Sequence, residues 1–369
     1  MKNVFKTIIL FLLLFLSFTN FSFSRENDEY SYHRGVVKEV VSVEETEIEG
    51  FDDVQIETTL SVRLIEKDEI VEIDIVGLKN QITREYSSGD RVILSEFSMP
   101  DGQTSYSIVS YDRQNTLLLL FIIFLVLALI ISSKRTIGAV LGLGFSFLMI
   151  FIFLIPQILS GASPVFISIL TAIIIIPVNF YLSHGFNKKT SVAIFSTVIA
   201  LIITGFLALI FMGAANITGQ GLEETMLITT MVDSTINIEG LLLAGVIIGT
   251  LGVLDDITIS QVAIVKQISE VGEKLESTEI FTRAMSIGKD HMASMINTLV
   301  LVYTGASMPL LIIFVNAQVP LNYVLSLEVV SIEIVRTLVG TIGLVSAIPI
   351  TTFIATMVFK KKVEQKLGI

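Results

Sequence analysis

The sequence predicts an α-helical polytopic membrane protein with a small N-terminal β-rich domain, for which an OB-like barrel is one candidate. Three observations carry this prediction. The 369 residues are 52% hydrophobic and only 16% charged, with a mean hydropathy of +0.79, whereas a soluble domain is about a quarter charged. Residues 33–112 alternate in polarity with a period of two, and seven long apolar stretches follow from residue 116.

Residues 1–24 have the pattern of an export signal. Lys2 and Lys6 form the basic region, residues 8–16 the apolar region, and Ser22-Phe23-Ser24 a small-x-small cleavage motif. The segment is interpreted as a signal peptide or, if it stays uncleaved, as an N-terminal anchor. Both alternatives place residue 25 onward outside the cytoplasm.

Residues 25–115 are predicted to form the acidic, β-rich extracytoplasmic domain. Residues 71–75 alternate apolar and acidic side chains, as a half-buried strand does, and similar runs occupy 36–43, 54–64, 91–97 and 105–110. This segment holds 9 Lys and Arg against 21 Asp and Glu. Its net charge of −12 excludes nucleic acid as a partner. An envelope protein that binds through residues 30–112 is the partner we consider for it.

Residues 116–359 are predicted to be the transmembrane domain, because each apolar stretch is long enough for a helix across about 30 Å of hydrocarbon. The expected spans are 116–132, 137–155, 165–183, 190–212, 239–257, 292–315 and 337–359. Basic residues cluster in alternate connections and in the tail 360–369, and the intervening connections contain one, Arg336. The positive-inside rule therefore predicts a cell-membrane protein with a cytoplasmic C-terminus.

Asp255 and Asp256 are the best pointer to function, because two adjacent carboxylates in apolar surroundings are costly. Thr258 and Gln261 add oxygen atoms nearby. One interpretation is a broken helix that lines a polar site for Na⁺, H⁺ or Mg²⁺. The other is that a helix ends near Leu254 and the aspartates start the next one as its N-cap and first turn.

A second polar cluster opens the sixth span. Asp290, Ser294 and Asn297 recur at the spacing of one helix face, and His291 lies beside them. Asp290 as an N-cap, with Asn297 bonding neighbouring helices, is the alternative interpretation. Because the two clusters flank the same hairpin, residues 261–285, we expect them at matching depths, with a shared site in which His291 titrates.

Enzymatic chemistry has little support in this sequence. There are no cysteines, the three histidines are far apart, and no phosphate-binding glycine loop or hydrolase motif occurs. We therefore expect no catalytic residues and no cofactor, and the identity of any bound metal stays open.

Four strings of residues resemble the signatures of the YibE/F family. They are Gly-Val-Leu-Asp-Asp-Ile-Thr-Ile-Ser-Gln (252–261), Gly-Lys-Asp-His-Met-Ala-Ser-Met-Ile-Asn-Thr-Leu-Val-Leu (288–301), Tyr-Thr-Gly-Ala-Ser-Met-Pro-Leu (303–310) and His-Gly-Phe-Asn-Lys-Lys-Thr-Ser (184–191). The resemblance covers residues 117–359. It implies a bacterial multi-pass membrane protein whose Asp pair and Asp-His motif are family hallmarks, without implying a function.

Two functions remain from these observations. The first is transport of an ion or small polar solute through the bundle, past Asp255, Asp256, Thr258, Gln261, Asp290, His291, Ser294 and Asn297. The second is an accessory or scaffold protein, in which the β-rich domain binds an envelope partner and the polar residues only hold helices together. A polar cavity at the aspartates would favour the first, and tight packing there the second.

Overall fold

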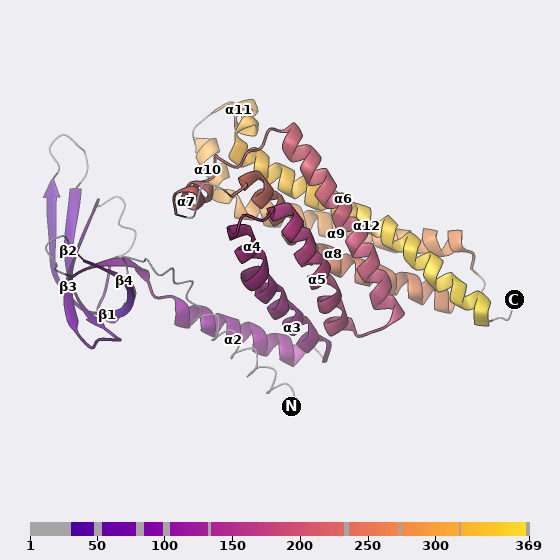
Figure 1. Ribbon diagram of the computed structural model, residues 1–369, viewed down its shortest axis with the longest axis horizontal. Helices are drawn as coiled ribbons and strands as arrows, with labels where there is room; N and C mark the ends of the chain where they lie inside the picture. Colours follow the sequence, from indigo (N-terminus) through magenta and orange to yellow (C-terminus); the bar gives the residue numbers. More distant parts are fainter. Residues whose placement is uncertain are drawn as a thin grey trace. The chain divides into compact units, whose positions relative to one another are not determined.

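The computed structural model describes residues 31–47, 54–78, 85–98, 104–131, 134–231, 236–272, 275–316 and 319–366. The chain divides into two compact units, Met1–Ile131 and Ser132–Ile369. The first contains a β-sheet and one helix, and the second contains only helices among its described residues (Figure 1). The predicted signal segment lies outside the described residues.

The sheet confirms the predicted β-rich domain, with a strand at each of the five expected positions. They are β1 Ser31–Glu47, β2 Val54–Leu64, β3 Ile70–Leu78, β4 Arg91–Ser98 and β5 Thr104–Tyr111. The order is β3-β2-β1-β4-β5 with antiparallel neighbours, and the edge strands β3 and β5 approach each other. The result is a barrel-like sheet.

The long first strand makes this curvature, because it pairs with β2 along most of its length and with β4 at its start. Register shifts between Val37 and Glu39 and between Val40 and Ser42 bend it, as β-bulges do. The sheet closes over a core of alternate apolar residues: Val37, Leu60, Val62, Leu64, Ile73, Val92 and Leu94. Alternation thus sets which face is buried, as the sequence pattern predicted.

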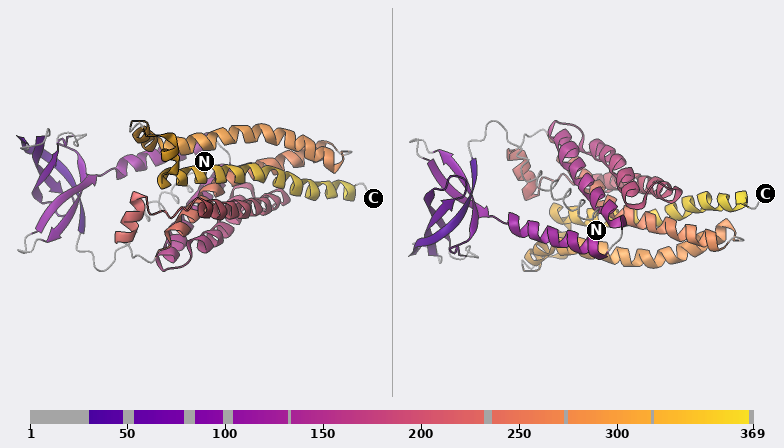
Figure 2. Two further views of the ribbon diagram at one scale, coloured as in Figure 1. Left: turned by 90° about the horizontal axis from the view of Figure 1, so that it is seen from above. Right: turned by 90° about the horizontal axis from the view of Figure 1, so that it is seen from below.

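The helical part begins with α2, Gln114–Ile131, in the first unit. The second unit contains α3 Lys134–Met149, the π-helix η1 Ile150–Leu154, α4 Ile155–Leu159, α5 Pro164–His184, α6 Lys188–Ala214, α7 Glu223–Met231, α8 Ile238–Val271, α9 Ser277–Ala306, α10 Met308–Asn316, α11 Leu321–Ser326 and α12 Glu328–Lys366. Both views in Figure 2 show α9 alongside α12.

Five of these helices are long and apolar enough to cross a membrane: Ile137–Leu159, Pro164–His184, Lys188–Ala214, Ile238–Val271 and Glu328–Lys360. A sixth crossing results if α9 and α10, which meet at 63°, form one bent span. The seventh predicted stretch is the shorter apolar helix α2. All seven predicted stretches are thus helical, but five, not seven, meet the length and composition of a single span.

Two helices extend well past the predicted spans. The α8 helix continues to Val271 and α9 starts at Ser277, so the predicted hairpin is the joined ends of two long helices. The α12 helix is continuous from Glu328, whose carboxylate accepts hydrogen bonds from the Gly219 N–H at 2.6 Å and from the Thr218 N–H.

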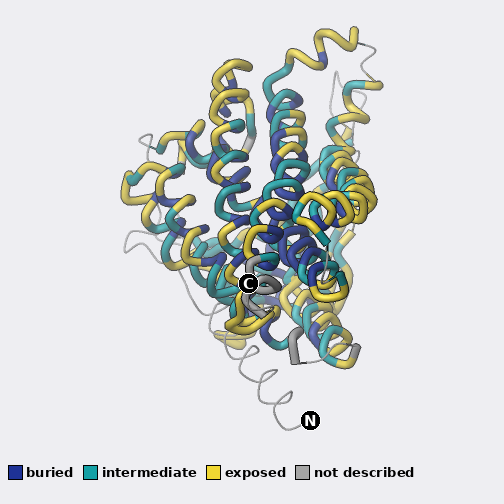
Figure 3. The backbone as a smooth tube through the Cα atoms, turned by 90° about the vertical axis from the view of Figure 1, so that its right-hand side faces the viewer, coloured by how far each residue is buried: buried dark blue, intermediate teal, exposed yellow. Residues whose placement is uncertain are grey.

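The core of the helical unit surrounds α8, which packs against α5, α6, α9 and α12. Figure 3 shows buried residues where these helices meet and exposed residues on their outward faces. Small side chains allow close crossings. A Cβ on Gly343 of α12 would lie 2.0 Å from the Thr204 hydroxyl of α6, so only glycine fits there.

Candidate functional site

Asp255 and Asp256 lie inside an unbroken helix. The α8 helix runs through both, so neither the predicted break nor the predicted N-cap is present. The reason is the buried stripe on its inner face, which continues past the aspartates at helical spacing: Leu251, Leu254, Thr258, Gln261 and Val265. Packing of this stripe holds the helix together where the sequence alone suggested an end.

The two aspartates line a cavity of about 300 Å³ between α3, α5 and α8. Asp255 is half-buried and Asp256 exposed. The other lining residues are Ala139 and Leu143 of α3, Asn179, Phe180, Ser183 and His184 of α5, and Gly252 and Ile259 of α8. Residues with carboxylate, amide, hydroxyl and imidazole groups therefore line one open cavity between three apolar helices.

Two buried oxygen atoms that belong to residues lining this cavity have no hydrogen-bond donor. They are Asp255 Oδ1 and Asn179 Oδ1, and the statement holds for the described residues. The nitrogen of the Asn179 amide donates to Ser146 Oγ at 2.8 Å, and Ser146 donates to the Gly142 carbonyl at 3.0 Å. That chain orients the amide. A buried acceptor without a donor costs about 1–3 kcal/mol, so the pair calls for a proton, water or cation.

Close contact between α3 and α5 forms one wall of the cavity. A Cβ on Gly138 would lie 1.9 Å from the Leu182 carbonyl oxygen, and one on Gly142 would lie 3.0 Å from Asn179 Oδ1. Gly138 and Gly142 form a GxxxG motif, which brings helix backbones together in membranes. Sequence reasoning missed Asn179 and this wall, although the motif was a readable signal.

Thr258 and Gln261 join helices and do not line the cavity. The Thr258 hydroxyl lies 2.7 Å from the Thr197 hydroxyl of α6. The Gln261 amide donates to Thr352 of α12 at 2.7 Å and to the Ala284 carbonyl of α9 at 3.1 Å. Both side chains are buried. Their contacts are those of groups that bond helices to one another.

The second predicted cluster lies elsewhere. Asp290, His291, Ser294 and Asn297 are all exposed on α9, and none lines the cavity. Asp290 lies well inside α9, so it is not an N-cap. Gln261 contacts Ala284, and Gly249 lies beside Tyr303, which places the cluster near the level of Asp255. The cluster thus lies level with Asp255 along the neighbouring helix, but the structure does not bring the two clusters together.

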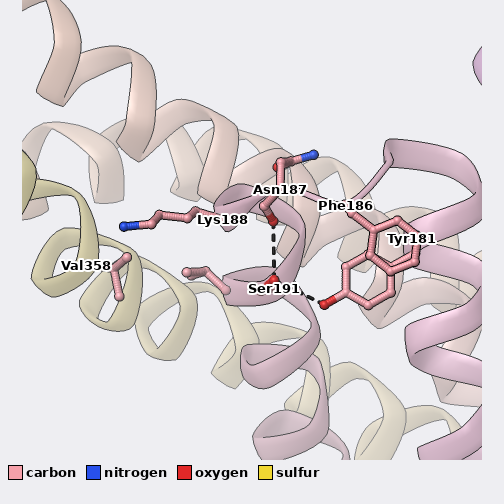
Figure 4. Close-up of a pocket in the computed structure, with 7 residues that line it drawn as sticks. Tyr181, Phe186, Asn187, Lys188, Ser191 and Val358 are labelled. Atoms are coloured by element: carbon pink, nitrogen blue, oxygen red, sulfur yellow. Dashed lines mark hydrogen bonds between the residues drawn. The ribbon is translucent and has the colours of Figure 1, made fainter.

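A second cavity, of about 450 Å³, lies at the start of α6 and shares no lining residue with the first. Figure 4 shows the rings of Tyr181 and Phe186 overlapping at one side, with Ser191 hydrogen-bonded to Tyr181. The ring centroids are 4.2 Å apart. Asn187 caps the helix by accepting from the Thr190 N–H. Lys188 is its one charged lining residue.

Comparison with known families identifies the helical region. A family model described as YibE/F-like protein matches residues 120–361, well over half of the chain. The chain belongs to the YibE/F-like family. The match contains every residue of the Asp255 cavity and stops short of the β-sheet. No curated protein and no solved structure shows a significant match to this YibE/F-like protein.

Proposed function

We propose that this YibE/F-like protein is a transport-type membrane protein, which moves a small cation or polar solute through the bundle beside Asp255. The observation that carries the proposal is a pair of buried oxygens without a donor, Asp255 Oδ1 and Asn179 Oδ1, on two residues that line one cavity. A carboxylate in a membrane-length helix is costly unless it meets water, a proton or a cation. A stable scaffold would gain by replacing it with an apolar residue.

The size of the cavity favours a small, partly hydrated occupant. A single water takes up about 30 Å³ of liquid, so about 300 Å³ leaves room for an ion and part of its hydration shell. Among the described residues, no three His, Asp or Glu side chains form a metal-binding group. Asp255, Asn179 and Ser183 would instead supply a few oxygen ligands, which suits a weakly held cation in transit.

The proposal includes the topology that the sequence predicts, with seven spans after a signal segment, an OB-like domain outside and the C-terminus in the cytoplasm. The basic ends of several helices lie near one another, which supports one common side. Lys188 and Val358 line one cavity, so the start of α6 lies near the end of α12. Gly138, near the start of α3, contacts Leu182 near the end of α5.

The second candidate is a scaffold that binds an envelope protein through residues 30–112. One observation favours it: the β-sheet exposes several large apolar side chains, namely Tyr32, Val41, Val43, Ile70, Val76 and Val109. Exposed apolar side chains offer a partner contact area that would leave water on binding. Thr258 and Gln261, which bond helices together, suit both functions.

Flux through purified protein in liposomes tests the proposal. A panel of H⁺, Na⁺, K⁺ and Mg²⁺ gradients is applied to wild type, Asp255→Asn and Glu270→Gln. Glu270 is an exposed carboxylate on the same helix outside the cavity, so its variant is the matched control. We expect flux of at least one ion in wild type and the control, and none in Asp255→Asn.

Equal flux in wild type and Asp255→Asn would end the transport proposal. The scaffold candidate makes a separate prediction, which needs no gradient. A membrane pull-down would recover an envelope protein with the full chain and lose it when residues 30–112 are deleted.

A further inference from the structure

The second cavity, at the start of α6, lies where the ends of three helices meet. Its lining comes from the end of α5, the turn into α6, the first residues of α6 and the end of α12. The volume of about 450 Å³ exceeds that of the Asp255 cavity. Lys188 is charged, and no carboxylate is among the described residues that line this cavity. The cavity therefore favours an anionic occupant.

The same cavity brings two basic segments together that are far apart in the sequence. Lys188 and Lys189 begin α6, and three consecutive lysines, 360–362, start two residues after Val358 of α12. Because Lys188 and Val358 line one cavity, the two basic segments come from helix ends that meet there. A negative group at this point is attracted by lysines from two different helices.

An exposed aromatic pair forms one side of the cavity (Figure 4). The ring of Phe186 is 86% exposed and stacks on Tyr181, with 18° between the two planes. Gly185 makes the turn before Phe186 with a φ of +75°, which glycine adopts without strain. The hydroxyl of Tyr181 lies 3.1 Å from Ser191 Oγ, and this hydrogen bond fixes the ring. The pair is thus a held apolar surface beside a lysine.

The position of this surface indicates what covers it. Val192 of α6 and Val358 of α12 add apolar lining, and both helices are long and apolar enough to cross a membrane. The lysines mark the ends of those helices, where hydrocarbon gives way to headgroups. An occupant with a negative group and an apolar body satisfies both kinds of lining. A free phosphate ion would leave the exposed ring of Phe186 in water, which is unfavourable.

We infer that this cavity binds an anionic phospholipid. Lys188 contacts the phosphate as a point charge, and the rings of Phe186 and Tyr181 pack against the glycerol and the first methylene groups of the acyl chains. Basic pockets between membrane helices hold anionic headgroups in this way. The inference is independent of the proposed function, because no residue lines both this cavity and the Asp255 cavity.

Native mass spectrometry of the purified protein tests the inference by counting bound lipid. The protein is titrated with phosphatidylglycerol, which is anionic, and with phosphatidylcholine, which has no net charge. We expect phosphatidylglycerol to bind more tightly, and Lys188→Gln to bind it roughly fivefold more weakly, as for one lysine at an anionic surface. Lys289→Gln is the matched control, because Lys289 is an exposed lysine of α9 outside the cavity.

Three results would overturn the inference. The first is equal binding of the two lipids by wild type. The second is equal weakening by Lys188→Gln and Lys289→Gln, which would indicate attraction to charge anywhere on the protein. The third is displacement of phosphatidylglycerol by inorganic phosphate at equal concentration, which would make a free anion the occupant in place of a lipid.

A second measurement tests the aromatic pair without changing any charge. A photoactivatable phosphatidylglycerol in bilayers should label the peptide that contains residues 186–192 in wild type, and label it less in Phe186→Ala. The ring is 86% exposed, so its removal leaves the core of the protein intact. Phe195→Ala, at a position of α6 that is 58% exposed and outside the cavity, should label as wild type does. Labelling spread evenly over the exposed helices, or equal labelling of both variants, contradicts the inference.

Discussion

Gln261 donates a hydrogen bond to Thr352 across 2.7 Å, although the two residues are 91 positions apart. The same amide reaches the Ala284 carbonyl at 3.1 Å, so one buried side chain joins α8, α9 and α12. A Cβ on Gly288 of α9 would lie only 2.9 Å from Gln261 Oε1, so a larger residue than glycine would crowd this amide. This junction fixes the register of three long helices next to the Asp255 cavity.

Replacing Gln261 with leucine should destabilise this junction. Both hydrogen bonds are lost, and interhelical bonds in membranes contribute about 0.6–2 kcal/mol each. Thermal unfolding in detergent should therefore show a lower melting temperature for Gln261→Leu. Gln267→Leu is the matched control, because Gln267 is exposed on the same helix. An equal effect of both substitutions would contradict the role given to Gln261.

Gly138→Ala should force α3 away from α5. The new methyl group would lie 1.9 Å from a backbone oxygen of Leu182, which cannot move without its helix. Overpacking of this kind typically costs about 1–3 kcal/mol. Gly245→Ala, where nothing lies within 4 Å, should be neutral or slightly stabilising. Melting temperatures of the two variants give the comparison, and similar values would argue against the close α3–α5 contact.

Asp255→Asn should raise stability while it removes function. Its buried Oδ1 has no donor in the described structure, and an unpaired buried carboxylate is destabilising. A neutral amide of the same shape removes most of that cost. We expect a higher melting temperature than wild type in detergent without added cations. A lower melting temperature would mean that the carboxylate already has a favourable partner.

The β-sheet should lose stability in acid through Glu96. The hydrogen bond from the Lys67 ammonium, 2.6 Å away, lowers the pKa of Glu96, against a smaller effect of burial. A carboxylate with a lowered pKa stabilises the fold above its unfolded pKa, about 4.3. That stabilisation is lost as the pH falls through the folded pKa. The hydrogen bond to Glu96 in turn raises the pKa of Lys67. The Lys67 ammonium therefore stabilises the sheet up to strongly alkaline pH, where it loses its proton.

A fragment spanning residues 25–113 allows this effect to be measured by urea unfolding between pH 2 and 8. Glu96→Gln should flatten the acid side of the stability profile relative to wild type. Glu39→Gln, at an exposed position of β1, should leave that profile unchanged. Parallel profiles for wild type and Glu96→Gln would refute the assignment.

The fold was largely predictable because its signals are local. The alternation of apolar and polar side chains in residues 71–75 and in the other runs predicted all five strands. The length of the apolar stretches predicted the positions of the helices. The ends of α8 were not predictable from local pattern. The local sequence at Asp255-Asp256 is typical of the start of a helix. The α8 helix continues past it because Thr258, Gln261 and Val265 pack against other helices.

The candidate site was predictable in part. Asp255 was identified because a carboxylate in apolar surroundings is energetically unfavourable. Asn179, which lines the same cavity, lies 76 positions earlier on α5, and nothing in the local sequence indicates that α5 packs beside Asp255. Asp290 was paired with Asp255 because their helices are consecutive. In the structure the two residues do not meet, because α9 buries the face that carries Gly288 and Leu299. Asp290 and Asn297 lie on the opposite, exposed face.

Infrared difference spectroscopy on the purified protein tests ion binding at Asp255 directly, because a carboxylate band shifts when its oxygen binds a cation. Spectra are recorded with and without each of H⁺, Na⁺, K⁺ and Mg²⁺, for wild type, Asp255→Asn and Glu270→Gln. We expect a carboxylate band that responds to at least one ion in wild type and in Glu270→Gln and disappears in Asp255→Asn. A response that persists in Asp255→Asn, or no response in wild type to any of these ions, would show that Asp255 does not bind the ion.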